Sequence, residues 1–228
     1  MNLEVLDSTE AAARRAAAVI AAGAQAAIDA RGRYLIAVSG GRTPWLMLRE
    51  LCAMEVPWAA VHLLQVDERV APDGHPDRNL THVQESLLDH VPIPITHVHA
   101  MPVNESDLAI GASEYQDTLR HVAGSPPVLD LVHLGLGPDG HTASLVPGDP
   151  VLKVTDADVA ITGDYQGRRR MTLTYPALNR ARQILWVVTG SDKTSMLTRL
   201  LAGDASIPAG NVRREGAVVV ADTAAAGT

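Results

Sequence analysis

Short apolar runs alternate with longer segments of helical spacing along most of this chain. The runs at residues 34–38 (YLIAV) and 184–188 (ILWVV) contain no charged residue, which is typical of parallel strands buried on both faces. Further strands are predicted at residues 61–66, 130–134 and 217–221. Helices are predicted at residues 8–30, 45–54, 80–90, 105–122 and 193–201.

Caps and breakers mark several boundaries. The alanine-rich segment 8–30 begins with Ser8, a good helix cap, and contains no proline. Residues 71–79 are rich in proline, glycine and aspartate and are predicted to form a loop. The polar segment 147–167 is expected to be irregular, and the alanine-rich tail beyond Ala221 is expected to fray.

Strands that alternate with helices indicate an α/β fold with a mainly parallel sheet. No linker, charge block or internal repeat divides the 228 residues, so a single domain over residues 1–228 is expected. The chain has no phenylalanine and only 3% aromatic residues, so valine, leucine, isoleucine and alanine must build the core. That composition suits a buried sheet covered by alanine-rich helices.

Three polar motifs stand where predicted strands end. They occupy residues 39–44 (SGGRTP), 67–69 (DER) and 137–144 (GPDGHTAS). Each is interpreted as a strand-to-helix junction. Because open α/β sheets bind ligands at the carboxyl ends of their strands, we expect the three motifs to converge on one site.

The first motif is predicted to cradle an anion. Two glycines and a helix that starts near Thr43, with Pro44 in its first turn, present backbone N–H groups to negative charge. The motif lacks the glycine–lysine ending of a P-loop, which disfavours a nucleotide triphosphate. Ser39 is not expected to be a nucleophile, because a hydrolase elbow needs glycine where Ala37 stands. The candidate binding residues are Ser39, Gly40, Gly41, Arg42 and Thr43.

Cationic side chains near other strand ends are candidate phosphate ligands. The planar fork of Arg69 matches phosphate oxygens, and Lys193 lies at another predicted strand-to-helix junction. One of the consecutive arginines Arg168, Arg169 and Arg170 is expected to turn inward, while the others are solvated.

The most informative stretch is residues 130–147, DLVHLGLGPDGHTASLVP. An apolar strand leads through three glycines to Asp139, His141, Thr142 and Ser144 at a predicted helix start. Histidine alone has an unperturbed pKa close to neutrality, so His141 is a candidate general base.

Composition excludes several classes of function. The formal net charge of −7 argues against a nucleic-acid-binding protein, although a local basic pocket can still bind a small phosphate. Cys52 is the single cysteine, so no internal disulfide is expected and a cytoplasmic location is the default. No apolar run approaches the roughly 20 residues of a membrane helix. The first residues do not resemble a signal peptide.

A metal site is not expected. His97 and His99 are predicted to share a strand face, but no third ligand lies at a suitable spacing.

Together the motifs resemble the 6-phosphogluconolactonase family, within the wider group that includes glucosamine-6-phosphate deaminase and ribose-5-phosphate isomerase. The matching segments are SGGRTP at 39–44, DER at 67–69, Asn79, GLGPDGHTASL at 135–145, RMTLT at 170–174 and TGSDK at 189–193. They follow the family's order and are highly specific as a set. The chain departs from the family at Val146, where phenylalanine is usual, and at Arg78, where serine is expected.

The resemblance implies a Rossmann-like three-layer αβα fold. It also implies hydrolysis of 6-phospho-D-glucono-1,5-lactone to 6-phosphogluconate in the oxidative pentose phosphate pathway, without a metal or an organic cofactor. A sugar-phosphate lactone is then the expected small-molecule partner, and a monomer is expected.

The family's histidine base falls on His141. The residues expected to bind substrate or phosphate are the 39–43 loop, Arg69, Asn79, Gly137, Asp139, Arg170 and Lys193. Asp67 is expected either to orient the base or to bind sugar hydroxyls, and the sequence leaves both readings open. Backbone N–H groups between Gly137 and His141 are expected to stabilise an oxyanion.

Three other functions are alternatives to the lactonase. A sugar-phosphate deaminase needs a glutamate in the segment after His141, where this chain has Thr142-Ala143-Ser144-Leu145. A nicotinamide enzyme is suggested by GxGxxG at residues 135–140, with Asp156 and Asp158 about 20 residues on, but Pro147 cuts the following helix short. A non-catalytic sugar-phosphate sensor would keep the anion cradle and would not need the histidine.

Overall fold

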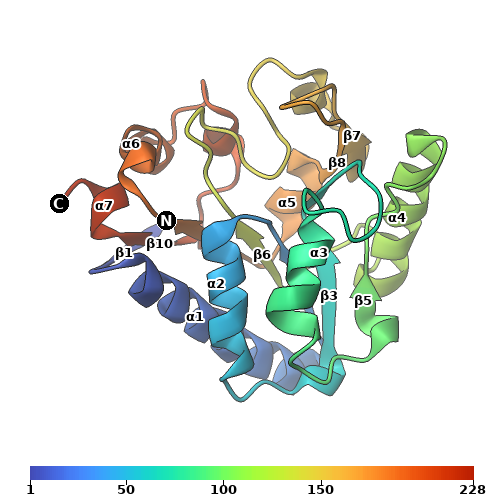
Figure 1. Cartoon of the computed structure of the whole chain (residues 1–228), viewed down its shortest axis with the longest axis horizontal. Helices are drawn as coiled ribbons and strands as arrows, with labels where there is room; N and C mark the ends of the chain where they lie inside the picture. Colours follow the sequence, from blue (N-terminus) through green and yellow to red (C-terminus); the bar gives the residue numbers. More distant parts are fainter.

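The computed structural model describes residues 1–228, which form a seven-stranded parallel sheet between two outer layers (Figure 1). The strand order is β1 (Asn2–Leu6), β10 (Val218–Asp222), β9 (Gln183–Val188), β6 (Leu131–Leu134), β2 (Tyr34–Val38), β3 (Val61–Gln65) and β5 (Val98–His99). Every pair in this sheet is parallel. The predicted α/β fold with a mainly parallel sheet is confirmed.

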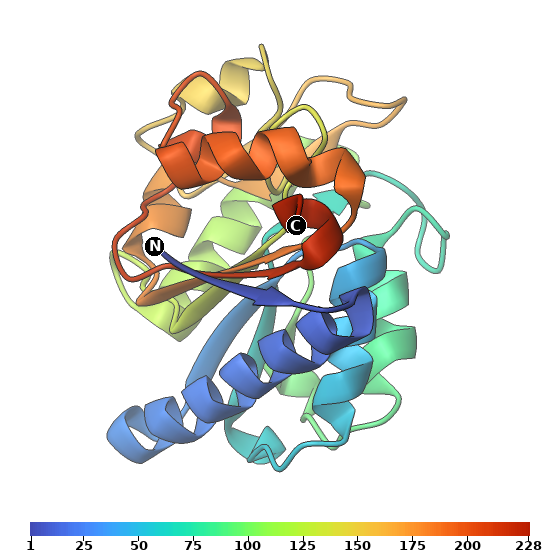
Figure 2. The same ribbon diagram turned by 90° about the vertical axis from the view of Figure 1, so that its left-hand side faces the viewer.

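One face of the sheet is covered by α1 (Thr9–Arg31), α2 (Arg42–Cys52) and α3 (Asn79–Val83), which continues as a π-helical turn at Gln84–Leu88. Helix α1 presents a stripe of small residues, from Ala12 to Ala27, that is almost fully buried. Small side chains let this long helix lie close across the sheet (Figure 2). Ser8 caps it by accepting a hydrogen bond from the backbone N–H of Ala11 (3.1 Å).

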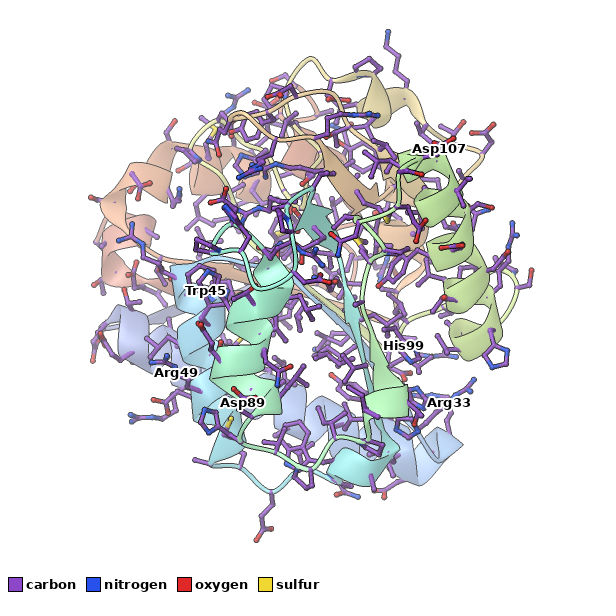
Figure 3. All side chains as sticks on the ribbon, turned by 45° about the vertical axis from the view of Figure 1, so that its right-hand side comes forward. Arg33, Trp45, Arg49, Asp89, His99 and Asp107 are labelled. Carbon is purple, nitrogen blue, oxygen red and sulfur yellow. The ribbon has the colours of Figure 1, made fainter.

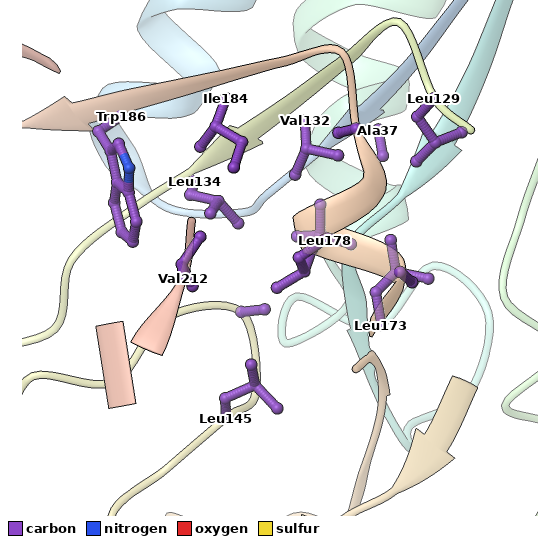
Figure 4. Close-up of a cluster of buried hydrophobic side chains, with 14 of the residues drawn as sticks. Ala37, Leu129, Val132, Leu134, Leu145, Leu173, Leu178, Ile184, Trp186 and Val212 are labelled. Atoms are coloured by element: carbon purple, nitrogen blue, oxygen red, sulfur yellow. The ribbon is translucent and has the colours of Figure 1, made fainter. Parts of the chain in front are cut away.

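The other face carries α4 (Leu108–Ala123), α5 (Tyr175–Arg180), α6 (Thr194–Ala202) and a small antiparallel sheet of β4 (Asp67–Arg69), β8 (Arg170–Leu173) and β7 (Val159–Ile161). Figure 4 shows part of the apolar cluster on this face, which includes Leu145 and Leu173 as well as Val132 and Ile184 of the main sheet. Along β2, Leu35 and Ala37 point into this cluster while Ile36 points into the other one. Burial on both faces explains why the interior strands read as continuous apolar runs.

Several elements differ from the predictions. Residues 67–69 are a strand of the small sheet and not a strand-to-helix junction. No helix begins within 137–144, because these residues form consecutive turns closed by a bridge between Thr142 and Leu145. The tail does not fray at once, since α7 (Thr223–Ala226) follows β10 and buries Ala225. The predicted irregular region contains β7.

The remaining regular structure is short. Single turns of 3₁₀ helix occur at Trp58–Ala60, Ile95–His97, Pro150–Lys153, Ser191–Lys193 and Pro208–Asn211. Both chain ends lie on the same side of the molecule, beside the β1 edge of the sheet (Figures 1 and 2). No helix combines the length and the apolar character needed to cross a membrane.

The direction of chain progression reverses between β2 and β6. From β2 the sheet continues through β3 to β5, whereas β6, β9 and β10 extend it the other way. Loops that leave two neighbouring strands in opposite directions open a crevice at their carboxyl ends, the usual ligand position in open α/β sheets. The loops after β2 and β6 are the predicted 39–44 and 135–144 motifs.

Candidate active site

A cavity of about 790 Å³ occupies this crevice. It collects loops that follow β2, β6 and β9, together with side chains from the small sheet. Twelve of the thirteen predicted site residues line it: Ser39, Gly40, Gly41, Arg42, Thr43, Asp67, Arg69, Asn79, Gly137, His141, Arg170 and Lys193. The thirteenth, Asp139, does not line the cavity but is hydrogen-bonded to His141. The expected convergence of the motifs on one site is confirmed.

The cavity is cationic although the chain is acidic. Its lining holds four cationic side chains, Arg42, Arg69, Arg170 and Lys193, against the carboxylates of Asp67 and Asp192. The chain as a whole carries a formal charge of −7. A local excess of positive charge of this kind favours an anionic ligand.

Two of these cations face each other. Arg69 on β4 and Arg170 on β8 are direct cross-strand partners, and the Nε–H of each is buried without a hydrogen-bond partner. Burial lowers the pKa of Arg170, and Asp67 opposes that change while Arg69 adds to it. Like charges directly opposite one another are unfavourable, so an anion bound between or beside the two guanidinium groups would be stabilising.

His141 is held by Asp139 in one orientation. Its ring Nδ1 lies 2.6 Å from Asp139 Oδ1, and the same oxygen accepts the backbone N–H of His141 at 3.1 Å. Burial raises the pKa of Asp139, but hydrogen bonds from His141 and Tyr165 and the charge of His141 outweigh it, so the pKa of this carboxyl is below its ordinary value. An ionised Asp139 accepts the Nδ1–H, which leaves Nε2 as the basic nitrogen.

The loop before His141 needs glycine at one position in particular. A Cβ on Gly137 would lie 2.1 Å from His141 Nδ1, so only glycine lets the imidazole pack against this backbone. Backbone N–H groups of the loop donate hydrogen bonds to acceptors within the loop itself. Gly137 donates to His141 O (2.8 Å), Gly140 donates to Gly137 O (3.0 Å), and His141 donates to Asp139.

The expected oxyanion site in this loop is therefore wrong for Gly137, Gly140 and His141. Their N–H groups are already donated within the loop, and no helix start supplies others.

Asp67 does not hydrogen-bond His141. Its Oδ2 accepts the hydroxyl of Ser144 at 2.6 Å, and its backbone carbonyl accepts the side-chain amide of Asn79 at 3.0 Å. Ser144 reaches it because the preceding Ala143 adopts a left-handed conformation (φ 49°) in the turn after His141. The carboxylate that contacts the His141 ring is therefore Asp139, while Asp67 lines the cavity.

Glu68 was not identified from the sequence, yet it organises this part of the site. It is fully buried and accepts hydrogen bonds from Gln65 Nε2 (2.8 Å) and from the backbone N–H groups of Arg69 (2.7 Å), Asn79 (2.7 Å) and Leu80 (2.8 Å). Arg78 Nε lies 3.2 Å from it. The departure from the family at Arg78 therefore supplies a buried counter-charge for Glu68, which a buried carboxylate needs.

The 39–43 loop is fixed from both sides. A Cβ on Gly40 would lie 1.9 Å from Asn79 Oδ1, so this glycine permits the loop to pass close to α3. The hydroxyls of Thr43 and Thr189 are 2.6 Å apart, which ties the loop to the end of β9. Beneath it, the N–H of Ser39 donates to His133 Nδ1 at 3.3 Å. Burial lowers the pKa of His133 to about 3, so this ring stays neutral.

The arginines at 168–170 and Lys193 have different surroundings. Arg170 is the arginine of the 168–170 run that turns inward, whereas Arg169 is exposed and Arg168 pairs with Asp77 (2.8 Å). Lys193 lines the cavity beside Asp192, with 2.9 Å between their charged groups.

The histidines away from the site form a cluster. His97 lies in a 3₁₀ turn and so does not share a strand face with His99, but both rings contact His62. His62 Nδ1 and His99 Nε2 are 3.1 Å apart in nearly parallel rings (2°), a distance within hydrogen-bond range. Figure 3 shows His99 at the sheet edge near Arg33. No group of three or more ligands in the chain has metal-binding geometry.

Comparison with known proteins places this site in a family. Residues 7–220 match the family model for glucosamine-6-phosphate isomerases and 6-phosphogluconolactonases. The chain is 34% identical to the 6-phosphogluconolactonase of a Nostoc species, over 99% of this chain and 97% of that protein. It is 37% identical to the 6-phosphogluconolactonase of Mycobacterium tuberculosis, over 88% and 87% of the two chains.

Solved structures of such proteins have the same fold as this chain. The 6-phosphogluconolactonase of Thermotoga maritima superposes with a TM-score of 0.86 at 26% identity, covering 97% of this chain and 98% of that one. A monomeric glucosamine-6-phosphate deaminase superposes equally well (TM-score 0.86, 100% and 99% coverage) at 17% identity, which supports the fold alone. The chain belongs to the family of glucosamine-6-phosphate isomerases and 6-phosphogluconolactonases.

Proposed function

We propose that this chain hydrolyses 6-phospho-D-glucono-1,5-lactone to 6-phosphogluconate, with His141 as the general base. The observation that carries the proposal is the His141–Asp139 pair, 2.6 Å apart, at the wall of a cavity that also contains the opposed Arg69 and Arg170. The cavity thus combines a base with a site for phosphate. Relatives of similar length at 34–37% identity are 6-phosphogluconolactonases, which supports the lactonase reading over other activities of the family.

The reaction needs one water and no net redox change. His141 Nε2 takes a proton from water as the water oxygen attacks the lactone carbonyl carbon, which gives a tetrahedral oxyanion. When this collapses, the bond between the carbonyl carbon and the ring oxygen breaks, and His141 returns its proton to that oxygen. The product carboxylic acid then loses its proton to solvent. Asp139 stabilises the transient imidazolium because it remains ionised beside Nδ1.

The phosphate is assigned to the cationic side of the cavity. Arg69 and Arg170 offer two unpaired Nε–H donors, and the start of α2 offers backbone N–H groups at Arg42 and Thr43 that have no intrahelical acceptor. Lys193 adds a further charge from the β9 loop. Binding the phosphate there fixes the position of the lactone ring relative to His141, which is how binding energy serves the chemical step.

Sugar hydroxyls are assigned to Asp67 and Asn79. Asp67 Oδ1 has only a long contact to Asn79 (3.4 Å), so it retains acceptor capacity toward the cavity, while the Asn79 side-chain amide holds the Asp67 backbone in place. Ser39, Gly40 and Gly41 shape the wall between them and the α2 start.

We further propose that the enzyme acts without a metal or organic cofactor, as a monomer in the cytoplasm. Its substrate is a small sugar-phosphate lactone and not nucleic acid. The absence of any pair of cysteines is consistent with a reducing compartment.

The test is a coupled assay in which glucose-6-phosphate dehydrogenase makes the lactone and its disappearance is followed with and without this protein. Disappearance well above the spontaneous rate, together with no ammonia released from glucosamine-6-phosphate, is the expected result. Lactone loss at the spontaneous rate would contradict the proposal. In that case, binding of 6-phosphogluconate without turnover would indicate a sensor, and ammonia release a deaminase.

A further inference from the structure

Tyr165 lies on a tight hairpin next to His141 and Asp139. The hairpin is closed by a bridge between Tyr165 and Arg168, and its two tip residues, Gln166 (φ 54°) and Gly167 (φ 77°), are both left-handed. Gln166 lines the cavity from this position. Left-handed backbone at two consecutive residues is typical of a type I′ turn, which fixes the direction of the side chains that flank it.

The hydroxyl of Tyr165 reaches both members of the pair. It donates to Asp139 Oδ2 at 3.0 Å and lies 3.4 Å from His141 Nδ1, while its ring meets the imidazole edge to face with centroids 5.5 Å apart. Asp139 therefore uses one oxygen for His141 and the other for Tyr165. Burial raises the pKa of Tyr165, and the hydrogen bond to Asp139 adds to this, so the hydroxyl keeps its proton and remains a donor.

Tyr165 also contacts the proposed phosphate site. The guanidinium of Arg170 lies over the Tyr165 ring, 4.9 Å from its centroid, and Arg170 Nη2 approaches the carbonyl of Tyr165 (3.5 Å). A cation over an aromatic face is attracted by it. One side chain thus touches both the carboxylate that orients the base and the cation assigned to the substrate.

We propose that Tyr165 is a positioning residue of this active site. Its hydroxyl fixes the Asp139 carboxylate and withdraws part of that negative charge from His141, while its ring holds Arg170 toward the phosphate. This inference rests on the proposed function only for its kinetic consequences, because the contacts themselves do not require a substrate.

The decisive comparison is Tyr165→Phe, which keeps the ring under Arg170 and removes only the hydroxyl. Tyr175→Phe is the control: it loses the hydroxyl of another partly buried tyrosine, which donates to the carbonyl of Pro208 (2.8 Å) outside the active-site cavity. Both variants are first checked for parental thermal stability.

The first readout needs no substrate. The ring nitrogens of His141 are followed by NMR against pH in ¹⁵N-histidine-labelled protein, with the signals assigned by their loss in His141→Asn. Without the Tyr165 hydroxyl, Asp139 concentrates its charge on His141, so the ring should take up its proton at a pH higher by about 0.5, a roughly threefold change. The control should titrate like the parent. The charged groups that share the cavity, and that the substitution leaves in place, are Asp67, Asp192, Arg42, Arg69, Arg170 and Lys193.

The second readout is kinetic. In Tyr165→Phe, kcat for the lactone should fall by about three- to tenfold with KM within twofold, and the acid limb of the rate profile should move to higher pH with the NMR titration. If the His141 titration in Tyr165→Phe coincides with the parent, the positioning role is overturned, whatever the activity. If the titration moves but the parent does not hydrolyse the lactone, the proposed function fails while the role of Tyr165 in holding the pair stands.

Discussion

Arg69 and Arg170 carry the strongest residue-level argument for an anionic substrate. They are opposed across two antiparallel strands, and each buries an unpaired Nε–H. Both the repulsion and the unsatisfied donors are unfavourable in the free protein, and an anion bound beside the pair would relieve them.

Arg69→Ala should remove one charge-assisted contact, worth about 1.5–3 kcal/mol, and should raise KM about tenfold or more with a smaller change in kcat. Steady-state kinetics on the lactone measures this. Arg169→Ala is the control, because Arg169 is adjacent to Arg170 in the chain but exposed and outside the cavity lining. An unchanged KM in Arg69→Ala, or equal activity of the parent on unphosphorylated gluconolactone, would remove Arg69 from the phosphate site.

At the scale of elements, the loop from β6 to Leu145 fixes the position of His141. Gly137 leaves room for the His141 ring, and the turn at Ala143 brings Ser144 to Asp67 (2.6 Å). The loop therefore joins His141, which follows strand β6 of the main sheet, to the small sheet that carries Asp67 and Arg69.

Gly137→Ala should displace the imidazole, since the new Cβ would lie 2.1 Å from Nδ1. We expect kcat to fall by about tenfold or more while the folded state persists, because small displacements at a reacting group are costly. Gly135→Ala in the same loop meets no heavy atom within 4 Å and should lose much less. Similar losses in both variants would mean that the loop as a whole, and not the packing of His141, is sensitive to substitution.

The interior strands were predictable from the sequence because burial on both faces leaves an uninterrupted apolar run, and the motifs at 39–44 and 137–144 were predictable because glycine-rich turns mark the strand ends. Strand β1 was not predicted, since Asn2 and Glu4 interrupt the continuous apolar run by which the interior strands were identified. Strands β4 and β8 were missed because a three- or four-residue antiparallel strand in a site carries polar residues and no apolar pattern.

Site residues were predictable where a motif contained them and not where tertiary contact alone selects them. Glu68 lay inside the DER motif, but its buried hydrogen bonds depend on Asn79 and Leu80, which are eleven and twelve residues away. Tyr165 lies in a segment with no motif, 24 residues after His141. The helix expected near His141 does not form, because turns closed within the loop take up the N–H groups of Gly137, Gly140 and His141.

The edge of the sheet contains a pH-sensitive cluster. Burial lowers the pKa of His62 from 6.5 to about 4, with His97, His99 and Arg33 acting in the same direction, and burial also lowers the pKa of His99. Between these pH values the unfolded chain binds more protons than the folded one, so the free energy of unfolding falls as pH drops from 6.5 toward 4.

His62→Gln should therefore lose less stability than the parent between pH 7 and pH 5, measured by the urea midpoint of unfolding. His90→Gln, at an exposed histidine, is the control and should follow the parent. A parental pH dependence in His62→Gln would show that the cluster does not contribute.

On the scale of the whole molecule, the two apolar clusters lie on opposite faces of one sheet, and strands such as β2 contribute to both. We propose that residues 1–228 form a single domain. Unfolding followed by fluorescence and by circular dichroism should then give one coincident transition in urea. Separate transitions for the two probes would indicate that one layer unfolds independently.

The same shared sheet makes the site a property of the whole fold. Its residues come from the loops after three parallel strands and from the small sheet, so no segment contains a working site. His141, Asp67 and the cationic side chains are brought within one cavity only when the sheet is assembled.

The central claim is that His141 is the general base of a lactonase, and His141→Asn tests it most directly. The fold should be kept, because the side chain lies at the cavity wall and not in an apolar cluster. With thermal unfolding and 6-phosphogluconate binding close to those of the parent, kcat for 6-phospho-D-glucono-1,5-lactone should fall by about two to four orders of magnitude, the usual scale for loss of acid–base catalysis. A folded His141→Asn protein with near-parental kcat would contradict the claim and would place the base elsewhere, with Asp67 and Asp139 the first candidates.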